Sequence, residues 1–150
     1  MRIIDKLASG QTFSFEIFPP KGEMPLETAC AVASEMAADR PDWISVTYSA
    51  GGSGNSANTV PIAASIERDL GVTALAHLTC LGSSCSDVDA YVAALEDAGI
   101  ENVLALRGDR APGRDPIDFE HASDLIAYLR GSGVDLCIGA ACYPEGHVES

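Results

Sequence analysis

Short apolar runs rich in β-branched and aromatic residues recur about every 30 residues along the chain. They predict strands over residues 13–18, 43–48, 73–79, 102–107 and 135–141. Four stretches between them carry apolar side chains at helical spacing and predict helices over residues 26–38, 58–70, 87–98 and 122–131. Strands that alternate with helices at this spacing indicate parallel strands joined by right-handed crossovers. The fold class is therefore α/β, either an open doubly wound sheet or a closed barrel.

Residues that favour helix ends occur near the predicted boundaries. Ser86 is a candidate N-cap, and Pro25 and Pro61 suit the first turn of a helix. Three glycines fall where helices would stop in a left-handed turn: Gly71, Gly99 and Gly131. These signals agree with four crossover helices.

In three of the predicted strands, one of the two side-chain phases is polar. The polar positions are Ser14 and Glu16, Ser45 and Thr47, and His77 and Thr79. A sheet covered by helices on both faces would carry apolar residues in both phases, so the polar phase indicates an interior lined by functional groups. This pattern favours a barrel over an open sheet.

Polar and ionisable residues also lie at or just beyond the C-terminal part of successive strands. They are Glu16, Thr47, His77, Arg107 with Asp109, and Tyr143. In parallel α/β folds this rim is where substrates bind, whether the sheet is open or closed. Any one of these residues alone is explained as well by a structural hydrogen bond, but their shared position predicts one binding site.

Charge and hydropathy narrow the classes of function. The formal net charge is −13 and the nine Lys and Arg residues are dispersed, so we expect no nucleic-acid or anionic-lipid partner. No apolar run reaches the roughly 20 residues that cross a bilayer, and residues 1–6 lack the layout of a signal peptide. We therefore expect a cytoplasmic protein that does not bind a membrane.

The five cysteines do not indicate a disulfide framework, because their number is odd. Reduced thiols are expected. Zinc and iron–sulfur sites usually contain C-x-x-C pairs, and the cysteines at positions 80 and 85, like those at 137 and 142, are spaced too widely for that motif. We expect no metal.

The glycine-rich stretch 51–54 follows a predicted strand, as phosphate-binding loops do. It fits neither the G-x-G-x-x-G fingerprint nor the P-loop spacing, and Asn55 excludes the G-x-S-x-G elbow of hydrolases. A rim loop is the better interpretation.

Six local strings occur at the predicted strand ends and in the segments that follow them. They are FSFEIFPPK (13–21), ISVTYSAGGS (44–53), AHLTC (76–80), LALRGD (104–109), HASDL (121–125) and AACYPEGH (140–147). In order and spacing they resemble the motifs of the methylenetetrahydrofolate reductases. The resemblance implies that residues 1–150 are the N-terminal part of a single (β/α)8 TIM barrel domain, of which about the first five strands and four helices are present.

The activity implied by the resemblance is reduction of 5,10-methylenetetrahydrofolate to 5-methyltetrahydrofolate, a step of one-carbon metabolism that serves methionine biosynthesis. FAD would carry hydride from NADH or NADPH to the folate substrate in ping-pong fashion, with NADH the usual co-substrate of bacterial-type relatives. Five strands do not close an eight-stranded barrel, so activity of these residues alone is not expected. Whether a homo-oligomer or a second chain completes the barrel is open.

The catalytic residues of the family match Glu16 and Asp109, and both would also contact the folate. Glu16 matches the acid that protonates the folate so that its imidazolidine ring opens to an electrophilic iminium, and a carboxyl group suits that role. Asp109 matches the residue near the flavin and the pterin, where its negative charge would tune the redox step.

The cofactor-binding residues of the family match Thr47, Tyr48, Ala50, His77, Arg107, Gly108, Asp109, His121, Tyr143 and His147. An arginine offers a fixed fork of donors to a phosphate or flavin oxygen, and a glycine lets the backbone approach closely. One position departs from the family, which usually has Tyr where His121 stands. An aromatic ring near the adenine would there become an imidazole.

Two other functions remain open at this point. One is a methyl-transferring pterin barrel, which would bind folate without flavin. The other is a non-catalytic, partner-dependent half-barrel of the same family. Flavin absorbance separates the first from the reductase, and turnover separates the second.

Overall fold

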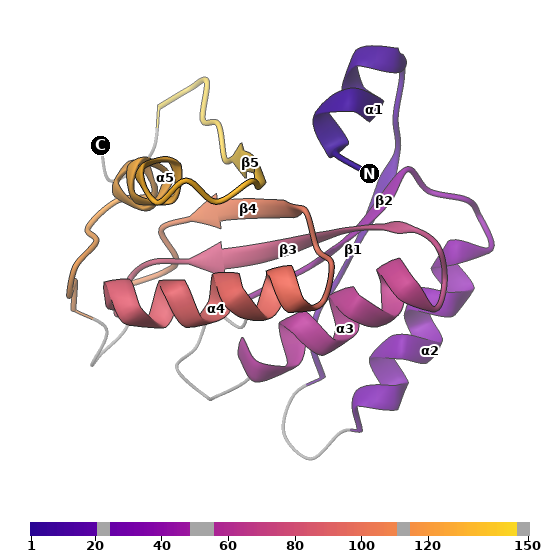
Figure 1. Cartoon of the computed structure of the whole chain (residues 1–150). Helices are drawn as coiled ribbons and strands as arrows, with labels where there is room; N and C mark the ends of the chain where they lie inside the picture. Colours follow the sequence, from indigo (N-terminus) through magenta and orange to yellow (C-terminus); the bar gives the residue numbers. More distant parts are fainter. Residues whose placement is uncertain (21–24, 49–55, 111–114, 147–150) are drawn as a thin grey trace.

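The computed structural model describes residues 1–20, 25–48, 56–110 and 115–146. Its five strands are β1 (Ser14–Ile17), β2 (Trp43–Val46), β3 (Thr73–Thr79), β4 (Asn102–Leu106) and β5 (Cys137–Ala140). The helices are α1 (Ile3–Ser9), α2 (Leu26–Ala37), α3 (Ser56–Arg68), α4 (Cys85–Asp97) and α5 (Ala122–Gly131). The alternation of strands and helices predicted from the apolar pattern is confirmed (Figure 1).

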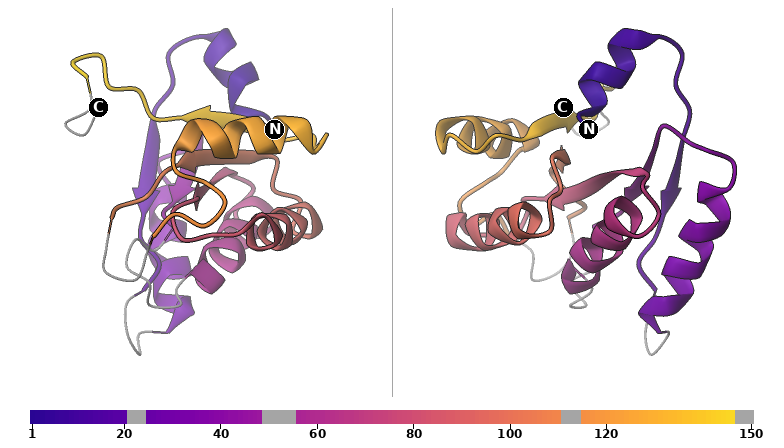
Figure 2. Two further views of the ribbon diagram at one scale, coloured as in Figure 1. Left: turned by 90° about the vertical axis from the view of Figure 1, so that its left-hand side faces the viewer. Right: turned by 45° about the vertical axis from the view of Figure 1, so that its right-hand side comes forward.

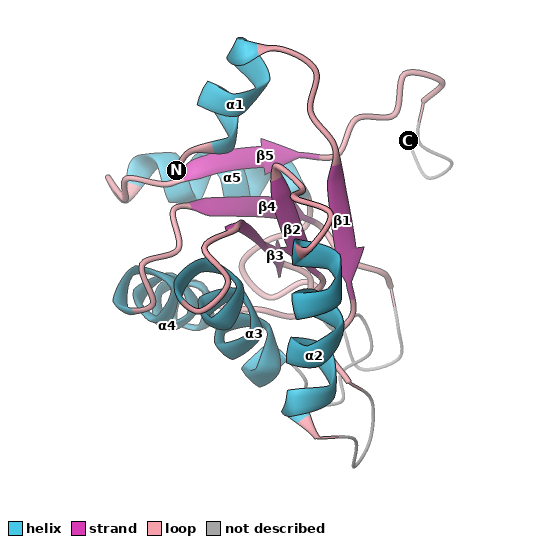
Figure 3. Cartoon of the chain, turned by 90° about the vertical axis from the view of Figure 1, so that its right-hand side faces the viewer, coloured by secondary structure: helices cyan, strands magenta, loops and turns pink. Residues whose placement is uncertain are grey.

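The five strands form one parallel sheet in the order β1-β2-β3-β4-β5. A doubly wound sheet would reverse its strand order at a switch point, and this sheet does not. The sheet curves, and α2 to α5 all lie on its outer side (Figure 3). This is the arrangement of the first five units of a (β/α)8 barrel, so the α/β barrel class is confirmed.

Side-chain phase separates the two faces of the sheet. In β4, Val103 and Ala105 face the helices and are fully buried, whereas Leu104 and Leu106 on the inner face are half-buried. The largest buried side chains of the core, from strands and covering helices, include Ile44, Ile62, Ile66, Leu78, Leu95, Leu125 and Leu129. The polar strand positions therefore fall on the inner face, as the alternation predicted.

The short helix α1 was not predicted from the sequence. It lies against the beginnings of β4 and β5 (Figure 2), where the buried side chain of Asn102 holds it. The Oδ1 atom of Asn102 accepts a hydrogen bond from the backbone N–H of Ile3 at 2.8 Å, and its Nδ2 donates to the carbonyls of Met1 and Ala74 at 3.1 and 3.3 Å. One amide thus joins α1 to two strands.

Two predicted helix boundaries differ in the structure. The N-cap of α4 is Ser84 rather than Ser86, because Ser84 and Asp87 form a reciprocal capping box. Gly131 is the last residue of α5, and Gly133 is the glycine with a left-handed backbone, at φ +77°. Gly71 and Gly99 have positive φ as predicted.

The two prolines also differ from the prediction. Pro25 is the N-cap of α2, with extended backbone at φ −64° and ψ 147°. Pro61 lies inside α3, because that helix begins at Ser56, before the predicted start at residue 58. Proline inside a helix lacks the N–H for one backbone hydrogen bond.

Candidate functional site

Three polar side chains from consecutive strands meet on the inner face. The carboxylate of Glu16 on β1 accepts a hydrogen bond at Oε2 from the Ser45 hydroxyl of β2 at 3.4 Å. The same oxygen lies 3.4 Å from Nε2 of His77 on β3. The Glu16 side chain is 49% exposed, so the carboxylate is held by its neighbours and remains accessible to a substrate.

The imidazole of His77 is buried, with 7% of the residue exposed. Its Nε2 has no hydrogen bond to any described residue, because the contact with Glu16 has ion-pair distance without hydrogen-bond geometry. Burial lowers the pKa of His77, and the negative charge of Glu16 opposes that effect in part. A buried polar atom without a partner is costly, so this nitrogen is suited to contact a ligand.

The segment after β4 approaches β3 closely. Gly108 has φ +87°, and a Cβ atom at this position would lie 3.1 Å from the Cβ of Thr79. The backbone N–H of Leu81 donates to the carbonyl of Arg107 at 2.9 Å, and the Arg107 Nε donates to the carbonyl of Gly108 at 3.1 Å. This backbone position requires glycine, and Asp109 follows it as an exposed residue.

A buried thiol connects two of the predicted cofactor-binding segments. The Sγ atom of Cys80 lies 3.5 Å from the carbonyl oxygen of His121 and 3.8 Å from that of Arg107. Burial raises the pKa of Cys80 to about 11, so the thiol keeps its proton and acts as a donor. Cys80 therefore joins the end of β4 to the beginning of α5, where His121 is exposed and its N–H donates to Asp124 at 2.8 Å.

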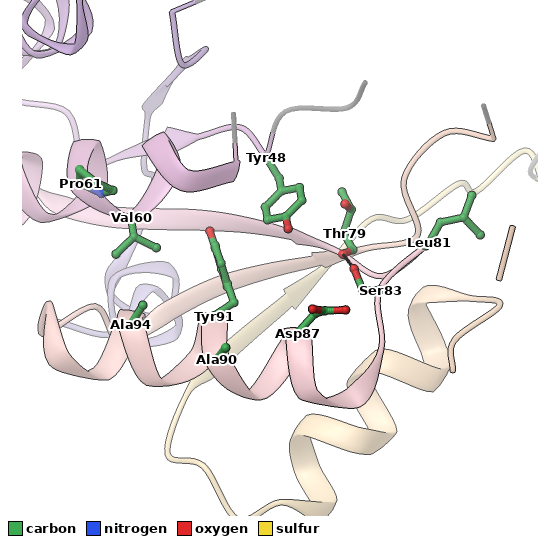
Figure 4. Close-up of a pocket in the computed structure, with 11 residues that line it drawn as sticks. Tyr48, Val60, Pro61, Thr79, Leu81, Ser83, Asp87, Ala90, Tyr91 and Ala94 are labelled. Atoms are coloured by element: carbon green, nitrogen blue, oxygen red, sulfur yellow. Dashed lines mark hydrogen bonds between the residues drawn. The ribbon is translucent and has the colours of Figure 1, made fainter. Parts of the chain in front are cut away.

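Tyr48 lies on the other side of the sheet from this cluster. Its ring packs edge-on against Tyr91 of α4, with centroids 5.4 Å apart and an interplanar angle of 72°. Both rings line a pocket of about 710 Å³ between α3 and α4 (Figure 4). Thr47, the preceding residue, is half-buried, and its carbonyl accepts a hydrogen bond from Thr59 at 3.1 Å.

The structure thus brings Glu16 and His77 together, and it joins Arg107, Gly108 and His121 through Cys80 and Thr79. Tyr143 lies in the exposed segment after β5. Two further predicted contacts lie outside the described residues: Ala50 and His147.

The hydroxyls of Tyr91 and Thr59, which contact the sheet from the helix side, were not predicted from the sequence. Tyr91 lies in helical phase with Val88 and Leu95, two buried residues of α4, and Thr59 is fully buried on α3. A hydroxyl within the apolar face of a helix was a signal that could have identified Tyr91.

The described residues add two general observations. No three His, Cys, Asp or Glu side chains among them converge on a point that could hold a metal ion. No helix in this part of the chain is long and apolar enough to cross a membrane.

Comparison with known proteins gives consistent matches. The family described as methylenetetrahydrofolate reductase matches residues 2–150. Methylenetetrahydrofolate reductase 2 of Schizosaccharomyces pombe is 38% identical over 156 residues, which cover 99% of this chain and 24% of that protein. The probable methylenetetrahydrofolate reductase (NADH) of Oryza sativa subsp. japonica is 35% identical over 161 residues, which cover 100% of this chain and 27% of that protein.

A bacterial relative shows the same similarity over a larger share of its own length. The 5,10-methylenetetrahydrofolate reductase of Escherichia coli (strain K12) is 34% identical over 137 residues, covering 91% of this chain and 45% of that protein. The chain therefore spans less than half the length of each of these three relatives.

Proposed function

Because the chain belongs to the methylenetetrahydrofolate reductase family, we propose that its strand ends bind FAD and take part in the reduction of 5,10-methylenetetrahydrofolate to 5-methyltetrahydrofolate. The observation that carries the proposal is the contact between an accessible carboxylate, Glu16, and a buried imidazole with an unpartnered nitrogen, His77. These two groups supply a proton donor and a ligand contact at one place on the inner face.

The residues present fit a flavin. His77 offers Nε2 to a polar atom of the ring. Gly108 lets the segment after β4 pack closely against Thr79 of β3, which places Arg107 and Asp109 beside the site. The Arg107 guanidinium follows β4 directly and suits a phosphate or flavin oxygen. When bound there, FAD supplies the hydride-accepting and hydride-donating chemistry of the reaction.

Glu16 serves as the general acid in this proposal. The Ser45 hydroxyl holds one carboxylate oxygen, and the exposed fraction of the side chain leaves the group open to the folate. Its proton passes to the imidazolidine nitrogen whose C–N bond breaks, which leaves an iminium carbon to accept hydride and become the methyl group. Solvent then returns a proton to Glu16.

The other family positions extend the site. Asp109 would place a negative charge beside the flavin and the pterin, because it follows Gly108 directly. Thr47 and Tyr48 follow β2, and His121 is joined to Arg107 through Cys80. The remaining proposed contacts are Ala50, Tyr143 and His147. We propose NADH as the nicotinamide co-substrate, since the name of the rice relative specifies NADH.

The proposal is tested by absorbance spectra of the purified chain and of a version extended to complete the barrel, each taken after incubation with FAD and gel filtration. Retained flavin absorbance that is bleached by NADH and restored by methylenetetrahydrofolate supports it. Folate binding without retained flavin would overturn it in favour of a flavin-free pterin barrel. Retained flavin with no change on addition of NADH and folate would favour a non-catalytic half-barrel.

A further inference from the structure

Two hydroxyl groups from the covering helices contact backbone carbonyls of β3 and of the residue that follows β2. The Tyr91 hydroxyl on α4 donates a hydrogen bond to the carbonyl oxygen of His77 at 2.9 Å. The Thr59 hydroxyl on α3 donates to the carbonyl oxygen of Thr47 at 3.1 Å. Each acceptor belongs to a residue that the proposed function places beside the flavin.

These contacts occur where backbone pairing between the two strands stops. The register of β2 and β3 ends with the pair Val46 and Ala76. Thr47 follows β2, and His77 is the next residue of β3, which continues to Thr79 and pairs there only with β4. A parallel ladder fixes the spacing of two strands only along its length. Beyond the last pair of the β2–β3 ladder, the two hydroxyls bind the carbonyls of Thr47 and His77 from the helix side.

The two hydroxyl-bearing residues are themselves firmly placed. Thr59 is fully buried on α3. The Tyr91 ring packs against Tyr48 and turns its hydroxyl toward the sheet (Figure 4). Burial raises the pKa of Tyr91 well above its ordinary value, so its hydroxyl keeps the proton that it donates.

The geometry points to Tyr91 and Thr59 as positioning residues, which set the spacing between Thr47 and His77 beyond the last pair of the β2–β3 ladder and thereby place both residues against the flavin. This inference rests on the proposed function for its ligand. Its structural part, the control of the His77 environment by a hydroxyl on α4, holds with or without flavin.

The direct test compares Tyr91→Phe with Tyr128→Phe. Both changes remove one phenolic hydroxyl and keep the ring. Tyr128 is a matched control, because its ring also packs edge-on against an aromatic neighbour, Phe119, while its hydroxyl bonds to Asp89 on the outside of α4. Far-UV circular dichroism establishes that each variant is folded.

The first readout is the pKa of the His77 imidazole, measured by an NMR pH titration. The chain has three histidines, so the spectrum is simple, and His77→Asn assigns the signal. Glu16 is the charged group that acts on this imidazole and is unchanged in every variant. We expect Tyr91→Phe to raise the His77 pKa toward its ordinary value, because a loosened strand end admits water, and Tyr128→Phe to leave it unchanged.

The second readout is FAD affinity. Loss of one hydrogen bond that orders the site should weaken FAD binding by about tenfold in Tyr91→Phe and leave it unchanged in Tyr128→Phe. Thr59→Val should weaken binding in the same direction, whereas Thr59→Ser, which keeps the hydroxyl, should restore it. If Tyr91→Phe does not fold, the comparison of Thr59→Val with Thr59→Ser still tests whether these hydroxyls position the site.

The inference is overturned if Tyr91→Phe lowers only thermal stability, or if both tyrosine variants leave the His77 pKa and FAD affinity as in the wild type. If the wild-type protein binds no FAD, that result contradicts the proposed function instead. The His77 titration would then still decide whether Tyr91 controls the strand end.

Discussion

Nε2 of His77 lies 3.4 Å from Oε2 of Glu16, across a sheet in which β2 separates their two strands. The contact therefore depends on the curvature of the sheet and on the inward phase of both side chains. It joins the most buried ionisable group of the inner face to the carboxylate that we propose as the acid.

The buried His77 makes stability depend on pH. Its pKa in the folded protein is below the ordinary value of 6.5, so below pH 6.5 the unfolded chain takes up a proton that the folded chain does not. The free energy of unfolding should fall as the pH falls from 6.5 through the folded pKa, and become level below it. Urea unfolding at a series of pH values measures this.

The matched variants for this prediction are His77→Asn and His121→Asn. The first should remove that part of the pH dependence, and the second, at an exposed position, should retain it. An equal slope in the wild type and His77→Asn would show that His77 is not the responsible group.

Gly108→Ala should affect both stability and the site. The left-handed backbone at φ +87° costs about 1–2 kcal/mol for a residue with a Cβ atom, and the 3.1 Å contact with Thr79 adds to it. Gly99→Ala is the control, because Gly99 has φ +75° and open space around it. Gly108→Ala should lower the unfolding free energy further than Gly99→Ala, and it alone should weaken FAD binding. Equal effects of both variants on FAD binding would show that Gly108 is not part of the FAD site.

Asn102→Ala should detach α1. It leaves the N–H of Ile3 and the carbonyls of Met1 and Ala74 without their side-chain partner, which costs about 2–3 kcal/mol of unfolding free energy. Amide hydrogen exchange in α1 should increase more than in β4. Arg2→Ala removes a surface ion pair with Asp135 near the same helix and should cost less than about 1 kcal/mol. Similar losses for both variants would contradict the anchoring role of Asn102.

Much of the fold could be predicted from the sequence because its signals are local. The strand ends and the covering helices follow from apolar periodicity, which burial imposes on every repeat. Helix α1 was missed because it is short and buries only Ile3, while Ile4 and Leu7 are exposed. The sequence contains the capping-box pattern of Ser84 with Asp87, and this pattern identifies Ser84 rather than Ser86 as the N-cap of α4.

The site was less predictable, because contacts between strands depend on register and curvature. The polar residues at the C-terminal ends of the strands predict that Glu16 and His77 share one site. The distance between their side chains is known only from the structure. Tyr48 has the same side-chain phase as Ile44 and Val46, and this phase predicts that its ring faces the helices, where the structure places it against Tyr91. The resemblance to the family motif predicted a flavin contact instead. No local signal shows that the Tyr91 hydroxyl reaches the carbonyl of His77, fourteen residues earlier in the chain.

The central claim is that Glu16 protonates the folate while the flavin exchanges hydride independently of it. The most direct measurement is the flavin absorbance of Glu16→Gln in a version of the protein extended to complete the barrel, mixed first with NADH and then with methylenetetrahydrofolate. We predict that the variant binds FAD and is bleached by NADH as the wild type is, while its reoxidation by the folate is slowed at least about a hundredfold. Equal slowing of both half-reactions, or reoxidation at the wild-type rate, would contradict the assignment of Glu16 as the acid.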